Sequence, residues 1–183
     1  MEKRDRKKFL RIVLISSIVI LTILSVSSVR KLFILASFVV INYIFAYLKR
    51  KIPIGFIRKY FYGIELVLFC TVITSVTFGS IIGAFMGALL IVANYIAERR
   101  ISDYALIITF LYLAIGYASY FFRDTPIVLL GTIITIVYNL LAFILSKIKG
   151  ANLFSLAVFN LINIAFNLLL FNSLGNFVLL ILS

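Results

Sequence analysis

One acidic side chain and six asparagines are the residues best suited to bind a small ligand or an ion, because they lie inside long apolar stretches. The acid is Glu65, which we expect to face the protein interior, since a carboxylate among lipid chains is costly. It could couple the movement of a proton or cation, contact a ligand, or accept a structural hydrogen bond from Asn94, Tyr62 or Arg99. The asparagines are Asn42, Asn94, Asn139, Asn160, Asn163 and Asn167.

The positions of these polar residues predict a shared layer within the membrane. Asn42 lies seven residues before Lys49, and Asn139 lies eight before Lys147. At a helical rise of about 1.5 Å per residue, the layer falls roughly 8–15 Å below the inner surface. Spacings of three and four also put the asparagines of 160–167 on one helix face. That face either lines a cavity or forms interhelical hydrogen bonds worth about 0.6–2 kcal/mol each.

The sequence lacks the groups on which most catalytic and metal sites depend. It has no His and a single cysteine, Cys70. Its apolar stretches contain no closely spaced pair of acids, and it has no phosphate-binding G-x-x-x-x-G-K-[ST] motif. We therefore expect no catalytic residues, no metal and no cofactor, and we expect that the protein is not an enzyme.

The alternation of apolar runs and charged clusters predicts an all-α, polytopic transmembrane bundle of about seven spans. Of the 183 residues, 64% are hydrophobic, which is more than a soluble domain can bury. We expect one transmembrane domain, 1–183, with its spans at about 9–29, 32–48, 60–77, 80–97, 104–122, 127–146 and 151–171. Asn172–Asn176 is expected to break the last helix, and 177–182 is too short to span. Six spans plus a peripheral helix is the alternative.

The distribution of positive charge predicts the orientation of the chain. With a cytoplasmic amino terminus, fifteen of the 18 Lys and Arg residues fall on the cytoplasmic side, including a basic arm at 1–8. This bias follows the positive-inside rule and favours the plasma membrane as the location. The net charge of +12 is spread in short clusters between apolar runs, so we expect the bilayer, rather than nucleic acid, as the partner.

A ladder of small residues predicts where two helices pack closely. Gly79, Gly83 and Gly87 recur every four residues and so share one helix face. Ala84 and Ala88 form a second column beside them. In a bilayer, such a face lets a neighbouring backbone approach closely. The turn at Gly79 predicts an antiparallel hairpin of the spans at 60–77 and 80–97, which would hold Glu65 near Asn94.

The stretch from Gly63-Ile64-Glu65 through Phe78-Gly79-Ser80 to Ala88 resembles the substrate-binding S components of energy-coupling-factor transporters. These proteins carry a phenylalanine-glycine-proline turn that opens a glycine-spaced helix. The same stretch is similar to the bacterial membrane protein MreD. The first resemblance implies a solute-recognition subunit of a transporter, which binds a small molecule without catalysis and works with other membrane subunits. The second implies a non-catalytic scaffold whose glycine face contacts another membrane protein. A small carrier coupled to protons or cations through Glu65 is a third hypothesis.

Overall fold

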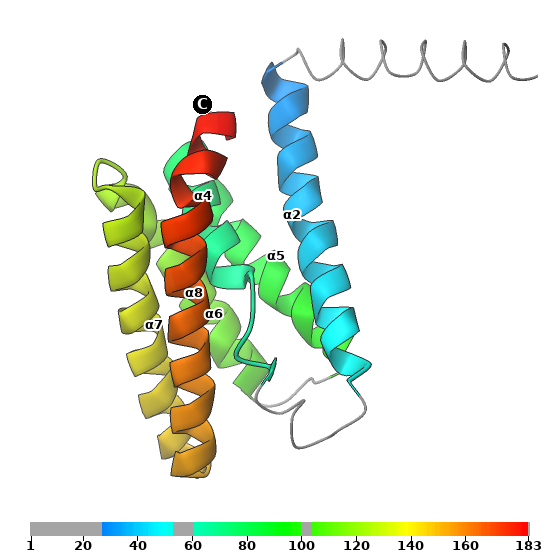
Figure 1. Cartoon of the computed structure of the whole chain (residues 1–183), viewed down its shortest axis with the longest axis vertical. Coiled ribbons are helices and arrows are strands. Elements are labelled where there is room, and N and C mark those ends of the chain that lie inside the picture. Colours follow the sequence, from blue (N-terminus) through cyan, green and yellow to red (C-terminus); the bar gives the residue numbers. More distant parts are fainter. Residues whose placement is uncertain (1–26, 53–60, 100–103, 183) are drawn as a thin grey trace, which may run out of the picture. The chain divides into compact units, whose positions relative to one another are not determined.

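The computed structural model describes residues 27–52, 61–99 and 104–182, and in these ranges all regular structure is helical (Figure 1). The chain divides into two units, residues 1–37 and 38–183. The site described below lies entirely in the second unit. The helices are α2 (Ser27–Arg50), α4 (Val67–Phe78), α5 (Ser80–Glu98), α6 (Tyr104–Ser119), the short 3-10 helix η1 (Tyr120–Phe122), α7 (Ile127–Ile148) and α8 (Leu153–Leu182).

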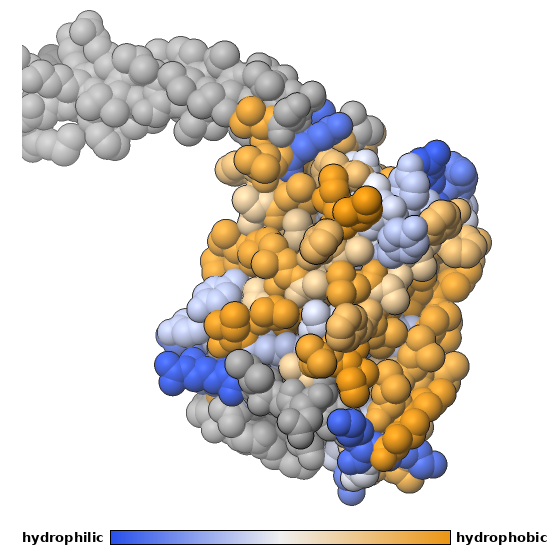
Figure 2. Space-filling model, turned by 180° about the vertical axis from the view of Figure 1, so that it is seen from behind, coloured by the Kyte–Doolittle hydropathy of each residue, from blue (hydrophilic) through white to orange (hydrophobic). Residues whose placement is uncertain are grey.

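Five of the described helices are long and apolar enough to cross a bilayer: Val29–Arg50, Ser80–Glu98, Ala105–Phe122, Ile127–Ile148 and Leu153–Leu182. The face shown in Figure 2 is mostly apolar, and hydrophilic side chains gather near the ends of the helices. This is the surface expected of a helical bundle solvated by lipid. The chain is a multi-pass membrane protein, and the prediction of an all-α transmembrane bundle is confirmed.

Helix α4 is the buried centre of the second unit. Its twelve residues rise only about 18 Å, which is less than the roughly 30 Å of a bilayer core. Every residue from Val67 to Ser75 is buried, and α5, α6, α7 and α8 all contact the helix. Such a short apolar helix is stable in this place because neighbouring helices, and not lipid, cover it.

Close backbone contacts hold α4, α5 and α6 together. A Cβ atom on Gly83 of α5 would lie 2.4 Å from Cβ of Ser75 on α4. A Cβ atom on Gly116 of α6 would lie 2.4 Å from the backbone oxygen of Gly83. Gly87 packs against Thr71 in the same way. The glycine face is therefore occupied by helices of the same chain.

Gly79, Ala84 and Ala88, the other residues of the predicted ladder, differ in position and burial. Gly79 makes the turn between α4 and α5. Its φ is 108°, a backbone conformation that residues other than glycine rarely adopt. Ala84 is buried, whereas Ala88 is half-buried on the same helix. The hairpin thus has its turn at the predicted residue, but its first helix is shorter than the span at 60–77.

The prediction of seven spans is not supported, and two of its boundaries are wrong for visible reasons. Helix α2 runs through Arg30 and Lys31, where the sequence analysis placed a turn. Both are good helix formers, and neither Gly nor Pro lies near them to stop the helix. The span at 60–77 becomes a helix only at Val67, because the chain before it makes turns around Gly63. The arm at 1–8 and nearly all of the span at 9–29 lie outside the described residues.

The expected break at Asn172–Asn176 is also wrong, because α8 continues without interruption to Leu182. Ser173 satisfies its hydroxyl inside the helix by donating a hydrogen bond to the carbonyl of Leu169. Gly175 is buried, with Ile127 of α7 beside it. Packing on α7 thus outweighs the roughly 1 kcal/mol that an interior glycine costs a helix. Residues 172–182 extend a spanning helix and do not form a separate peripheral one.

Candidate functional site

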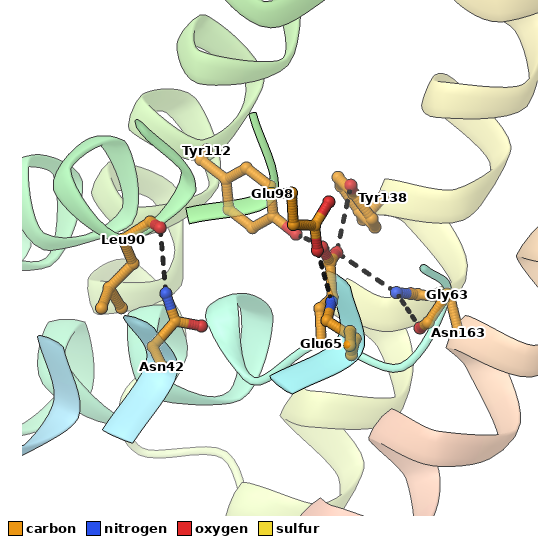
Figure 3. A network of polar contacts seen from close by, with 9 residues as sticks. Asn42, Gly63, Glu65, Leu90, Glu98, Tyr112, Tyr138 and Asn163 are labelled. Carbon is orange, nitrogen blue, oxygen red and sulfur yellow. Dashed lines mark hydrogen bonds and ion pairs between the residues drawn. The ribbon is translucent and has the colours of Figure 1, made fainter. Parts of the chain in front are cut away.

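A buried carboxylate, Glu65, lies at the centre of a polar network between α6, α7 and α8 (Figure 3). The side chain is only 5% exposed. Its Oε1 accepts a hydrogen bond of 2.6 Å from the hydroxyl of Tyr112 and one of 3.2 Å from Nδ2 of Asn163. The hydroxyl of Tyr138 lies 3.4 Å from the same oxygen. Three helices thus supply donors to one carboxylate oxygen.

The irregular chain before α4 places Glu65 in this network. A Cβ atom on Gly63 would lie 2.7 Å from the carbonyl oxygen of Phe159, so only glycine lets this stretch approach α8 so closely. The carbonyl of Gly63 accepts a hydrogen bond of 2.9 Å from Nδ2 of Asn163. Non-helical backbone within a membrane protein is tolerated where the protein satisfies its polar groups. Here Asn163 replaces the helical N–H that would otherwise bond this carbonyl.

The asparagines behind Glu65 form a continuous chain of hydrogen bonds. Nδ2 of Asn139 on α7 donates to Oδ1 of Asn163 at 2.8 Å. Nδ2 of Asn167 donates to the backbone oxygen of Asn163 at 3.0 Å and to its Oδ1 at 3.2 Å. Asn163 and Asn167 are fully buried. These contacts fix the rotamer of Asn163 and thereby the direction of its bond to Glu65.

Helix α2 contributes polar contacts away from this chain of asparagines. Nδ2 of Asn42 donates a hydrogen bond of 3.0 Å to the carbonyl of Leu90 on α5. One and a half to two turns further on, Nζ of Lys49 lies 2.7 Å from Oε1 of Glu98, and both side chains are buried. Asn42 therefore binds α5 and does not join the cluster around Glu65.

A cavity of about 260 Å³ opens beside Glu65. It lies among the carboxyl ends of α5 and α7, the amino-terminal halves of α6 and α8, and the irregular chain before α4. The lining residues are Tyr62, Glu65, Ile91, Asn94, Tyr95, Glu98, Ile108, Tyr138, Ala142, Ser146, Ala151, Leu156, Phe159 and Asn160.

Three polar groups at this cavity have bonding capacity left over among the described residues. Oδ1 of Asn94 is buried and has no hydrogen-bond partner, although the residue is only 4% exposed. Asn160 is 8% exposed and no described residue bonds its amide. All the described bonds of Glu65 end on Oε1, which leaves Oε2 free on a residue that lines the cavity. Six other buried polar atoms without a partner belong to described residues that do not line the cavity, so it is the cavity beside these three groups that makes them candidates for a ligand contact.

The structure brings together most of the residues that the sequence singled out. Glu65, Asn94 and Asn160 line the cavity. Asn163 donates a hydrogen bond to Glu65, and Asn139 and Asn167 in turn donate to Asn163. Asn94 shares the cavity with Glu65, but the described donors to Glu65 are Tyr112, Tyr138 and Asn163. Sequence analysis missed all three as partners of the acid. The position of Tyr112 in the middle of an apolar run was a usable signal, because an interfacial tyrosine lies near a span end.

Comparison with known proteins adds no relative. No protein-family model matches the sequence, and no curated protein and no solved structure matches the chain. Among the described residues, no group of three or more His, Cys, Asp or Glu side chains could hold a metal ion. Function is therefore argued from the geometry of the cavity.

Proposed function

We propose that the protein is an integral solute-recognition subunit of a transporter in the plasma membrane, which binds a small molecule without catalysis. The observation that carries this proposal is the cavity beside Glu65, whose Oε2 receives no donor from the described residues. Leaving a buried acceptor unpaired costs about 1–3 kcal/mol. A ligand that supplies the missing donor would recover that free energy on binding.

The support around the cavity suits recognition rather than mere packing. Glu65 is held by donors from α6, α7 and α8, so its free oxygen has a fixed direction. A ligand that meets prearranged polar groups loses less free energy in ordering them. Apart from Glu65, Asn94, Glu98, Ser146 and Asn160, the lining residues are apolar or aromatic, as in most small-molecule sites.

A thermal-unfolding experiment in detergent tests the proposal. A panel of vitamins, amino acids, amines and sugars would be added to the purified protein, and we expect at least one compound to raise the melting temperature. At a ligand concentration 100-fold above Kd, the gain is about 2.7 kcal/mol. Absence of any rise across the panel would overturn the proposal.

A matched pair of variants assigns the effect to the cavity. Ala151 lines the cavity, and Ala157 on α8 is exposed and does not line it. Ala151→Phe should abolish the ligand-induced rise, because the ring fills the space. Ala157→Phe should leave it intact. An equal loss in both variants would place the binding elsewhere.

The partner subunits are part of the same proposal. The sequence contains no phosphate-binding loop, so energy for transport would come from another protein. Co-purification of an ATPase subunit with the tagged protein would support this assignment. The scaffold hypothesis is less favoured, since α4 and α6 already occupy the glycine face through which it would act.

A second candidate, a carrier coupled to protons or cations, is favoured by the place of Glu65 in irregular chain directly before α4. Interrupted helices mark the ion and substrate sites of many transporters. Flux of protons or sodium into liposomes should then disappear with Glu65→Gln. Flux that survives this substitution would remove the candidate.

A further inference from the structure

We propose that the solute is a small organic ammonium ion whose charged group binds Oε2 of Glu65, an inference that rests on the proposed solute-binding function. It concerns the chemical class of the ligand. The groups that the fold leaves unpaired around the cavity support this inference.

Glu65 has one oxygen saturated and one available. Oε1 receives the hydroxyl of Tyr112 and the amide of Asn163, with the hydroxyl of Tyr138 at 3.4 Å. Oε2 receives none of these donors, although Glu65 lines the cavity. An ionised carboxylate only accepts hydrogen bonds. A ligand that binds Oε2 of the ionised side chain must therefore be a donor.

Asn94 on helix α5 also favours a ligand that donates hydrogen bonds. Its Oδ1 is buried without a partner among the described residues, and the amide belongs to the cavity wall. An ammonium group carries several N–H donors and no acceptor. It therefore suits a cavity in which the unpaired oxygens of Glu65 and Asn94 are both acceptors, whereas a carboxylate or phosphate ligand would add further acceptors.

The charge around the cavity also favours a single positive charge on the ligand. Two acids line it, Glu65 and Glu98, and none of the described lining residues is a Lys or Arg. Lys49 already lies 2.7 Å from Glu98. An ionised group away from water is costly unless it is paired, so a monocation at Glu65 completes the balance.

The apolar and aromatic residues that line the cavity indicate the polarity of the rest of the ligand. Ile91, Ile108 and Phe159 supply apolar surface, while Tyr95 and Tyr138 supply aromatic rings. Ring faces attract ammonium groups when they are shielded from water. The volume of 260 Å³ equals that of about nine water molecules, since each occupies about 30 Å³ in the liquid. This space suits an amine with a short apolar body.

Two probes of equal size separate charge from shape. 2-Phenylethylamine is an ammonium ion at neutral pH, and 2-phenylethanol is its neutral counterpart. With the wild-type protein in detergent, we expect the amine to raise the melting temperature and to bind at least tenfold more tightly than the alcohol. 3-Phenylpropionate, an anion of similar length, should not bind.

Variants of Glu65 locate the charge effect. Glu65→Gln keeps the shape of the side chain and removes its charge, so the amine and the alcohol should then bind equally. Ala157→Phe, away from the cavity, should keep the tenfold preference. If Glu65→Gln fails to fold, the preference of the wild-type protein for amine over alcohol still tests the proposal.

The outcomes distinguish this inference from the proposed function. If neutral or anionic solutes bind while ethyl- to phenylethylammonium ions do not, the ammonium inference is overturned and solute binding stands. A tenfold preference that persists in Glu65→Gln also overturns it. If no compound of any charge raises the melting temperature, the proposed function itself fails.

Discussion

At the scale of single residues, Asn163 organises the site more than the carboxylate does. Its amide nitrogen donates to the carbonyl of Gly63 and to Glu65, and its amide oxygen accepts from Asn139 and Asn167. One side chain therefore joins α7, α8 and the irregular chain before α4. Because the residue is fully buried, loss of its amide would leave the carbonyl of Gly63 without its described donor and would remove one hydrogen bond each from Glu65, Asn139 and Asn167.

Asn163→Leu should accordingly destabilise the protein by about 1–3 kcal/mol, the cost of leaving buried polar partners unsatisfied. Asn172→Leu, at an exposed position of the same helix, should change stability by less than about 0.5 kcal/mol. Both values would come from reversible unfolding in mixed micelles. Equal stability of the two variants would contradict the organising role of Asn163.

Residue spacing predicted part of this site and could not predict the rest. Asn160, Asn163 and Asn167 share a helix face by simple periodicity, and they do so in the structure. The partners of Glu65 are Tyr112, Tyr138 and Asn163, which lie 47, 73 and 98 residues further along the chain. No local pattern encodes such distances. They depend on Gly63, whose missing side chain matters only once α8 lies against it.

At the scale of helices, the packing of α4, α5 and α6 depends on backbone contact. A Cβ atom on Gly116 would meet the carbonyl oxygen and carbon of Gly83 at 2.4 and 2.5 Å, and neither backbone atom can rotate away. The sequence analysis identified Gly83 from its four-residue spacing. It missed Gly116, because a single glycine in an apolar run has no periodicity.

Gly116→Ala and Gly83→Ala should each force α5 away from its neighbour and lower stability by about 1–3 kcal/mol, as overpacking does in close-packed cores. Ala114→Leu adds a larger group at an exposed position of α6 and should have little effect. Melting temperatures in detergent would compare the three variants. Unchanged stability of both glycine variants would show that the helices are not in backbone contact.

The attachment of α2 to α5 through Lys49 and Glu98 leads to another prediction. Removing one partner of a buried ion pair costs about 3–5 kcal/mol, because the other charge stays buried without it. Lys49→Met should therefore destabilise the protein strongly. Lys51→Met, at an exposed lysine two residues further on, should cost less than about 1 kcal/mol. Similar melting temperatures for these variants would exclude a structural role for the pair.

At the scale of the whole molecule, hydropathy predicted the class of fold better than the number of spans. Four of the five spanning helices, α5, α6, α7 and α8, begin within two residues of the expected starts at 80, 104, 127 and 151, whereas α2 begins five residues before the expected start at 32. The errors occur where tertiary packing overrides local signals. Burial lets α4 be short, and contact with α7 keeps α8 helical past Gly175.

The orientation of the bundle gives the last prediction. Helix α7 has 22 residues and a length of about 33 Å, enough to separate Asp124 from Lys149 by the thickness of a bilayer. Lys147 and Lys149 lie at its carboxyl end, so the positive-inside rule predicts that Lys149 faces the cytoplasm and Asp124 the outside. In a Cys70→Ala background, Asp124→Cys should react with a membrane-impermeant maleimide on intact cells. Lys149→Cys should react only after permeabilisation. The wild-type protein should not react in either case, because Cys70 is buried. Labelling of Lys149→Cys alone on intact cells would reverse the orientation and place the cavity on the outer side.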